Sequence, residues 1–212
     1  MWSFLTLFEL GGLFAAFATI AITIFIAELT DKDALLLLTL ATKIKPWTAF
    51  AAGSAAFTIT SAIIVTVGYF LIQVIPIFWV KLAGGIVMVG YALFEYFRDK
   101  NRGNKEAAND EKLLSRTLKK NGWSVFFSAI SLLILLDLAG DATEVLTIVY
   151  VARFSNALLV FFGAVAALVS ASALETILGR RLAKILSAEK IRVLSIAVFL
   201  IIGALIITTT LL

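Results

Sequence analysis

The chain contains no cysteine, no histidine and only two prolines among its 212 residues. Without cysteine it can form no disulfide and offers no soft thiolate ligand to a metal ion. Without histidine it lacks imidazole ligands and the side chain that most often changes charge near neutral pH. Any ion chemistry must therefore rest on carboxylates, hydroxyls and backbone carbonyls.

Charged residues are also scarce: they make up 15% of the chain, whereas 61% of its residues are hydrophobic and the mean hydropathy is +1.04. A soluble domain carries roughly 25% charged residues. The apolar residues fall in blocks of about 20, the length that crosses a bilayer as a helix. These features predict an all-α membrane protein with six transmembrane helices. The predicted spans cover residues 11–41, 48–72, 76–97, 123–151, 156–178 and 191–212.

Two of these spans contain acidic clusters. The first cluster is Glu28-Leu29-Thr30-Asp31-Lys32-Asp33, and the second lies between Asp137 and Glu144. A charge in hydrocarbon costs at least a few kcal/mol, so intramembrane acids are functional-site hypotheses by default. We predict that the first and fourth helices are interrupted at these clusters. The alternative for the first motif is an internal salt-bridge cluster that only fixes helix packing. A second acidic cluster at the equivalent position of the chain makes this alternative less favoured.

The two clusters occupy matching positions in an internal repeat. A shift of 110 positions superimposes the two halves, and each half holds three spans. Because three is an odd number, the halves must be inverted in the membrane, a common plan of transporters with interrupted helices. The pairs matched by the shift include Gly12 with Gly122, Gly53 with Gly163 and Asp31 with Asp141. The predicted organisation is a first repeat over residues 1–97, a polar linker over 98–121 and a second repeat over 122–212.

The basic residues predict the orientation of the chain. Fifteen of the 18 lysines and arginines fall in the three loops that share one side of the membrane. Since cytoplasmic loops are enriched in these residues, the linker should be cytoplasmic and both termini should lie on the outer side of the cell membrane. The basic excess of the linker accounts for the net charge of +4, so no nucleic-acid partner is expected.

The first motif resembles the Glu-x-Gly-Asp-Lys/Arg-Ser/Thr signature of a family of six-span cation exchangers, whose eukaryotic members serve the Golgi and the chloroplast. The resemblance continues through Pro46-Trp47 and Gly53 and, in the second half, through Gly140-Asp141 and Ala152–Asn156. It implies an exchange of manganese or calcium for protons. The chain departs from the signature at a few positions. These are Thr30 and Asp33 in the first motif and Leu138 and Ala142 in the second.

The predicted metal site combines acids from both halves. Its members are Glu28, Asp31, Asp137, Asp141 and Glu144. Residues three, four or seven apart share a helix face, so the acids within each motif should project together. Hard divalent cations prefer carboxylate, carbonyl and water oxygens. In an empty site these acids should hold protons, because burial and neighbouring like charges both disfavour the ionised form. An entering cation would displace those protons.

Three other functions remain open at this point. Sodium-coupled cation exchange would use the same ligands, and an exporter of organic cations or amino acids is a second alternative. An enzyme is not expected, because the chain has no histidine, no cysteine and no recognisable nucleophile–base pair. An Asp31–Asp141 dyad is the one candidate for catalysis. No resident cofactor is expected either, and the oligomeric state is left open.

Glu175 is a further acid within an apolar span, and it precedes Arg180 by five residues. Long charged side chains near helix ends often extend to the interface while their stems remain in apolar surroundings. We predict such a surface pair near the cytoplasmic face.

Overall fold

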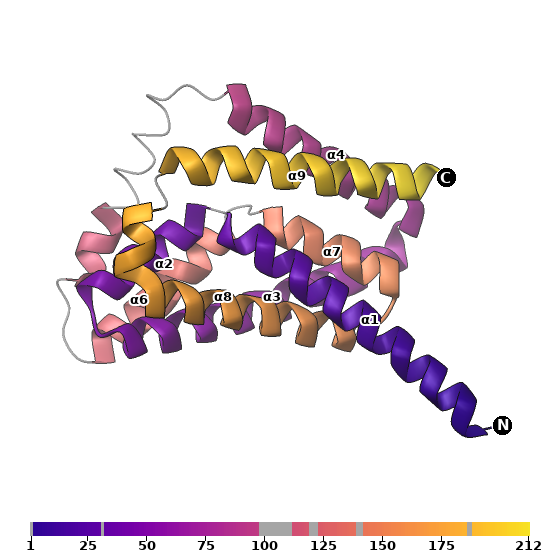
Figure 1. Ribbon diagram of the computed structural model, residues 1–212, viewed down its shortest axis with the longest axis horizontal. Coiled ribbons are helices and arrows are strands. Elements are labelled where there is room, and N and C mark those ends of the chain that lie inside the picture. Colours follow the sequence, from indigo (N-terminus) through magenta and orange to yellow (C-terminus); the bar gives the residue numbers. More distant parts are fainter. Residues whose placement is uncertain (1, 31, 98–111, 119–122, 139–141, 186–187) are drawn as a thin grey trace.

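The computed structural model describes residues 2–30, 32–97, 112–118, 123–138, 142–185 and 188–212, and every regular element within these ranges is a helix (Figure 1). A short helix over residues 112–118 lies within the predicted linker. The other helices are α1 (Trp2–Leu29), α2 (Lys32–Lys43), α3 (Pro46–Val74), α4 (Ile77–Phe97), α6 (Trp123–Asp137), α7 (Ala142–Phe154), α8 (Ala157–Ile185) and α9 (Ala188–Leu211).

Five of the described helices are long and apolar enough to cross a membrane. They contain the segments Gly11–Leu29, Pro46–Val74, Ile77–Phe97, Ala157–Ile177 and Arg192–Leu211. The helix α6 is also apolar but has only 15 residues, and α7 continues after it. Together α6 and α7 take the place of the fourth span, as α1 and α2 do for the first. The prediction of an all-α membrane fold with interrupted first and fourth helices is confirmed.

The two repeats interlock. The helices α1 and α2 pack on α8 of the second repeat, whereas α6 and α7 pack on α3 of the first repeat. The long helices α3 and α8, each of 29 residues, also pack on each other. In Figure 1, α3 and α8 lead in opposite directions along the bundle, as inversion requires. Each broken helix pair is therefore covered mainly by the other half of the chain.

The last helices of the two repeats, α4 and α9, form an antiparallel pair along one side of the bundle (Figure 1). Arg192, near the start of α9, donates to the carbonyl oxygens of Glu95 (2.6 Å) and Tyr96 (3.2 Å) at the end of α4. The guanidinium thereby joins the end of α4 to the start of α9.

Glycines set the distance between α4 and its neighbours. A Cβ on Gly203 would lie 3.0 Å from the carbonyl oxygen of Gly85, and a Cβ on Gly85 would lie 3.1 Å from that of Gly203. The adjacent Gly84 meets α7 instead, where a Cβ would overlap Val149 Cγ2. Small residues allow membrane helices to approach this closely. The pair Gly84–Gly85 therefore gives α4 close contacts with two different helices.

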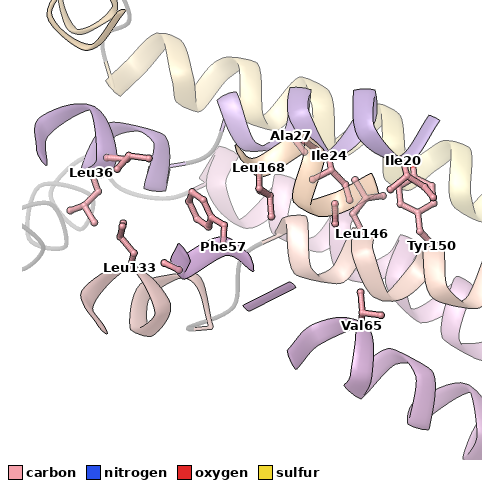
Figure 2. Packing of buried hydrophobic residues seen from close by; sticks show 14 of the residues in the cluster. Ile20, Ile24, Ala27, Leu36, Phe57, Val65, Leu133, Leu146, Tyr150 and Leu168 are labelled. Atoms are coloured by element: carbon pink, nitrogen blue, oxygen red, sulfur yellow. The ribbon is translucent and has the colours of Figure 1, made fainter. Parts of the chain in front are cut away.

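The apolar core lies between the broken helices and the two long helices. Phe57 of α3 and Leu168 of α8 occupy its middle, with Leu133 of α6 on one side and Leu146 of α7 on the other (Figure 2). Large apolar side chains also cover the outside of the bundle. This distribution is expected of helices whose outer faces contact lipid rather than water.

Two details add to the sequence prediction. The fifth span, predicted over residues 156–178, agrees with the apolar segment Ala157–Ile177, and the helix α8 continues beyond it to Ile185. The residues after this segment include leucine, alanine and isoleucine, which allow the helix to extend past the apolar stretch. Within the stretch predicted as a polar linker, the helix over 112–118 packs Leu114 and Thr117 inward.

The turn between α7 and α8 leads to a first prediction. Ser155 adopts a left-handed conformation (φ 50°), and Asn156 Oδ1 then accepts a hydrogen bond of 3.0 Å from the backbone N–H of Leu159. Asn156 therefore caps α8. We expect Asn156→Ala to destabilise the protein by about 1 kcal/mol, while Asn156→Asp retains the cap. Thermal unfolding in detergent would measure this, and equal losses in both variants would contradict the capping role.

Candidate cation site

The two helix breaks carry the candidate site. The first lies between Leu29, where α1 ends, and Lys32, where α2 begins; the second lies between Asp137 and Ala142. Both breaks lie in the middle part of the bundle along its long axis (Figure 1). At a helix end the last four carbonyls lack partners within the helix. Each break thus places the C-terminal end of a helix beside an acid of its motif, Glu28 in α1 and Asp137 in α6.

Glu28 and Asp137 lie at equivalent places, at the C-terminal ends of α1 and α6. Glu28 is 0% exposed and Asp137 is 3% exposed. The C-terminal end of a helix carries about half a negative elementary charge. A buried carboxylate at such an end is unfavourable unless a proton or a cation neutralises it. Both ends of the site therefore favour positive charge.

Glu144 lies in the first turn of α7, at the other side of the second break. Its residue is half-buried and its Oε1 atom is buried. The neighbouring Thr143 is buried as well. A helix N-terminus favours an anion, whereas the C-terminal helix end that carries Asp137 disfavours one. The second break is thus bordered by two carboxyl groups in opposite helix-end environments.

A contact between the repeats places Glu28 level with the start of α7 along the bundle. The hydroxyls of Thr23 in α1 and Tyr150 in α7 form a hydrogen bond. The two helices run in opposite directions (Figure 1), and Glu28 follows Thr23 by five residues, while Glu144 precedes Tyr150 by six. At a rise of 1.5 Å per residue, the end of α1 lies level with the first turn of α7. Glu28 and Glu144 therefore approach one level of the bundle from different repeats.

The prediction that the acids of the second motif share one helix face was wrong, because α6 ends at Asp137 and α7 begins at Ala142. Asp137 and Glu144 therefore belong to different helices, and their spacing of seven places them on no common face. The cause is local: each break changes the chain direction between the acids.

Asp31 and Asp141 lie outside the described residues, as do the side chains of Lys32 and Asp33. Among the residues that the structure does describe, no three acidic side chains gather closely enough to hold a metal ion. Glu28, Asp137 and Glu144 are thus placed around the breaks, and the five-acid site stays a prediction.

Thr30 closes the end of α1. Its backbone N–H (3.1 Å) and its Oγ1 (2.8 Å) both donate to the carbonyl oxygen of Ala27. The carbonyl oxygen of Thr30 in turn accepts a hydrogen bond from Ser195 of α9. These bonds hold the first break to α9. The threonine that replaces the glycine of the signature therefore has a structural role here.

Glu175 is a buried acid that the sequence prediction assigned to the surface. It is 1% exposed, and both of its carboxyl oxygens are buried. The buried residues of α8 recur in neighbouring pairs at every fourth position, and Glu175 belongs to the last pair. These pairs are Gly163–Ala164, Ala167–Leu168, Ala171–Ser172 and Glu175–Thr176. The prediction of a surface pair was wrong, because this stripe packs against α1, α2 and α3. In the sequence, small residues recur at every fourth position before Glu175, and this pattern could have indicated that Glu175 lies on a packed helix face.

A pocket of about 450 Å³ lies elsewhere, between the short helix over 112–118 and α6. Arg116 and Thr117 line it together with serines of α6. No acidic residue contributes to its lining. Its chemistry does not suit a divalent cation.

Comparison with known proteins gives one family match. A family model described as "Divalent cation/proton antiporter GDT1" matches residues 16–102 and, a second time, residues 125–211. The two matches have equal length and correspond to the two repeats. No curated protein and no solved structure matches the chain.

Proposed function

The chain belongs to the divalent cation/proton antiporter family GDT1, and from this premise we propose that it exchanges manganese or calcium for protons across the cell membrane. The proposed ligands are Glu28, Asp31, Asp137, Asp141 and Glu144. The observation that carries the proposal is the burial of Glu28 and Asp137 at the ends of two half-helices in equivalent positions.

The chemistry of these positions favours a hard divalent cation. Manganese and calcium are bound by carboxylate, carbonyl and water oxygens, and the chain offers neither thiolate nor imidazole. The helix ends add carbonyl oxygens and partial negative charge. A compact cation can use all of these groups at once, whereas a large organic cation cannot.

Exchange follows from the cost of leaving the acids ionised. Burial and neighbouring like charges favour protonation of the empty site. A bound divalent cation favours the ionised carboxylates instead, so the cation and the protons exclude each other. Each therefore leaves when the other enters, and the gradient of one can drive the other.

We propose that alternating access moves groups of helices that each combine parts of both repeats. The broken pair α1–α2 packs on α8, and the broken pair α6–α7 packs on α3. A movement that opens one break would therefore displace helices of both repeats together. The inverted arrangement gives two equivalent ways to do so, one towards each side of the membrane.

The orientation is part of the proposal. The loops richest in lysine and arginine, including the linker over 98–121, are placed in the cytoplasm, with both termini outside. The boundaries of the repeats at residues 97 and 122 are likewise proposed. Labelling of cysteines introduced into the linker, from outside and inside intact cells, would test the orientation.

Transport into proteoliposomes tests the function. With an acidic interior and an alkaline exterior, we expect manganese or calcium to enter as protons leave, at a rate at least about tenfold above protein-free vesicles. Magnesium and sodium serve as competing cations. The measurement combines a cation-sensitive dye inside the vesicle with a pH dye. Cation uptake without proton release, or proton release driven by sodium alone, would contradict the proposal.

A further inference from the structure

The pocket between the short helix over 112–118 and α6 has the chemistry of an anion site. Its volume of about 450 Å³ falls in the range of roughly 300–1,000 Å³ that is usual for small-ligand sites. Arg116 and Thr117 line it from the short helix, and three serines line it from α6. None of the described residues that line it is acidic. One positive charge and several hydroxyl groups therefore border the same cavity.

The short helix is fixed against the bundle, so its side of the pocket has a defined place. Leu114 is 3% exposed and belongs to the apolar core, and Thr117 is 6% exposed. The Oγ1 of Thr117 donates to the carbonyl oxygen of Leu113 (3.3 Å). Arg116 is exposed, and it has no carboxylate partner within the described part of the chain. Its guanidinium is thus held beside the cavity without a counter-charge from these residues.

The serines that line the pocket lie on one face of α6. Ser124, Ser128 and Ser131 are separated by four and three residues, which places them along one side of a helix. Apart from Asp137 at its end, every other residue of α6 is apolar. Ser131 donates to the carbonyl oxygen of Phe127 (3.0 Å), and its own oxygen can still accept. This face therefore offers hydroxyl groups to a ligand in the pocket.

The pocket extends along the first part of a membrane helix. The helix α6 begins at the exposed Trp123, and tryptophan is typical of the membrane–water interface. From Trp123 to Leu132, the deepest lining residue of α6, the helix rises about 13 Å. Ser124 therefore lies at the level of lipid head groups, whereas Leu132 lies within the hydrocarbon. Phe127 adds an exposed apolar surface between them. A matching ligand needs a polar part and an apolar part.

We propose that this pocket binds the phosphate head group of an anionic phospholipid. The guanidinium of Arg116 can donate two hydrogen bonds to phosphate oxygens, and Ser124 and Ser128 can donate to the remaining phosphate or glycerol oxygens. The acyl chains would then lie along the exposed ring of Phe127. The linker before α6 is rich in lysine and arginine, and such segments attract anionic lipids. The inference does not depend on the proposed transport.

Thermal unfolding of the full chain in a neutral detergent tests the role of Arg116. We expect phosphatidylglycerol to raise the Tm by at least about 5 °C more than phosphatidylcholine at the same concentration, because a ligand of the folded state stabilises it. In Arg116→Gln this difference should fall below about 2 °C. Lys112→Gln removes the same charge from the same helix outside the pocket lining and should behave as the wild type. Equal differences in the wild type and Arg116→Gln, or equal losses in both variants, would overturn the proposal.

Filling the pocket tests the site without a change in charge. Ser124→Leu adds an apolar side chain to the lining and should lower the number of phosphatidylglycerol molecules retained in native mass spectrometry by about fivefold. Leu135→Phe is the matched control, since Leu135 is exposed on α6 and does not line the pocket. It should retain the lipid as the wild type does. Undiminished retention in Ser124→Leu would contradict binding in this pocket.

Soluble phosphates distinguish the lipid from a free anion. Inorganic phosphate and glycerol phosphate offer the same oxygens to Arg116 but have no acyl chains. We expect neither compound to raise the Tm or to displace phosphatidylglycerol. If either compound stabilises the wild type as much as phosphatidylglycerol does, the lipid is rejected as the ligand. A wild-type protein that moves no divalent cation in proteoliposomes would refute the proposed function and leave these binding results unchanged.

Discussion

Glu28→Gln is expected to lower cation-driven proton movement by at least about 100-fold, which corresponds to about 2.7 kcal/mol. Glutamine keeps the shape of the side chain but can neither release a proton nor hold a negative charge. Glu28 lies fully buried at the end of α1, where the partial charge of the helix already favours a cation. Its loss removes both a ligand and a proton carrier.

Asp137→Asn should have a similar effect, because Asp137 occupies the corresponding place at the end of α6. Rates are measured in proteoliposomes at matched protein content, and size-exclusion profiles verify that each variant is folded. Glu189→Gln, an exposed acid in the first turn of α9, is the control and should transport normally. Full activity of both Glu28→Gln and Asp137→Asn would reject the two helix ends as the site.

Gly203→Val is expected to cause the largest loss of stability. Its Cβ would lie 3.0 Å from the carbonyl oxygen of Gly85 and 3.1 Å from the backbone nitrogen of Val89. Both neighbours are backbone atoms, so relief requires α4 and α9 to move apart. We expect a cost of about 3 kcal/mol and a decrease in Tm of roughly 10 °C for a chain of this length.

Gly90→Val provides the matched control for this stability effect. Gly90 also lies on α4, but a Cβ there would meet nothing within 4 Å. Its substitution should change the Tm by less than about 2 °C. Thermal denaturation followed by size-exclusion chromatography in detergent measures both variants. Similar Tm values for Gly203→Val and Gly90→Val would show that the close approach of α4 and α9 is unimportant.

The helical framework was predictable because hydrocarbon allows few ways to satisfy a backbone. Apolar blocks of about 20 residues must be helices, and acids inside them mark interruptions. The helices α1 and α6 indeed end within the two acidic motifs. What hydropathy does not report is the partner of each helix. The packing of α1 on α8 and of α6 on α3 joins segments that lie far apart in the sequence.

The repeat register shows a second limit. A shift of 110 positions pairs Asp31 with Asp141 but leaves Glu28 opposite Leu138. The two family matches begin and end 109 positions apart, at residues 16 and 125 and at residues 102 and 211. That shift pairs Glu28 with Asp137. The second break is longer than the first, so no single shift relates both sides of it. Asp137 is therefore the counterpart of Glu28.

Glu175 was misjudged for a related reason. One acid a few residues before an arginine has the same local pattern whether it reaches the surface or lies in the core. The position of α8 between α1, α2 and α3 decides the matter, and that position is a property of the whole bundle.

The interlocking of the repeats has a consequence for biosynthesis. The buried face of α1 that carries Glu28 is covered by α8, whose matching residues are translated roughly 140 positions later. At about 5–20 residues per second, the ribosome needs on the order of 10 s to reach them. During that interval α1 lies in the bilayer while Glu28 lacks its native neighbours from α8. Protonation of Glu28 would remove the cost of a charge in hydrocarbon and so keep the unfinished chain in the membrane. The same protonation is proposed to serve transport.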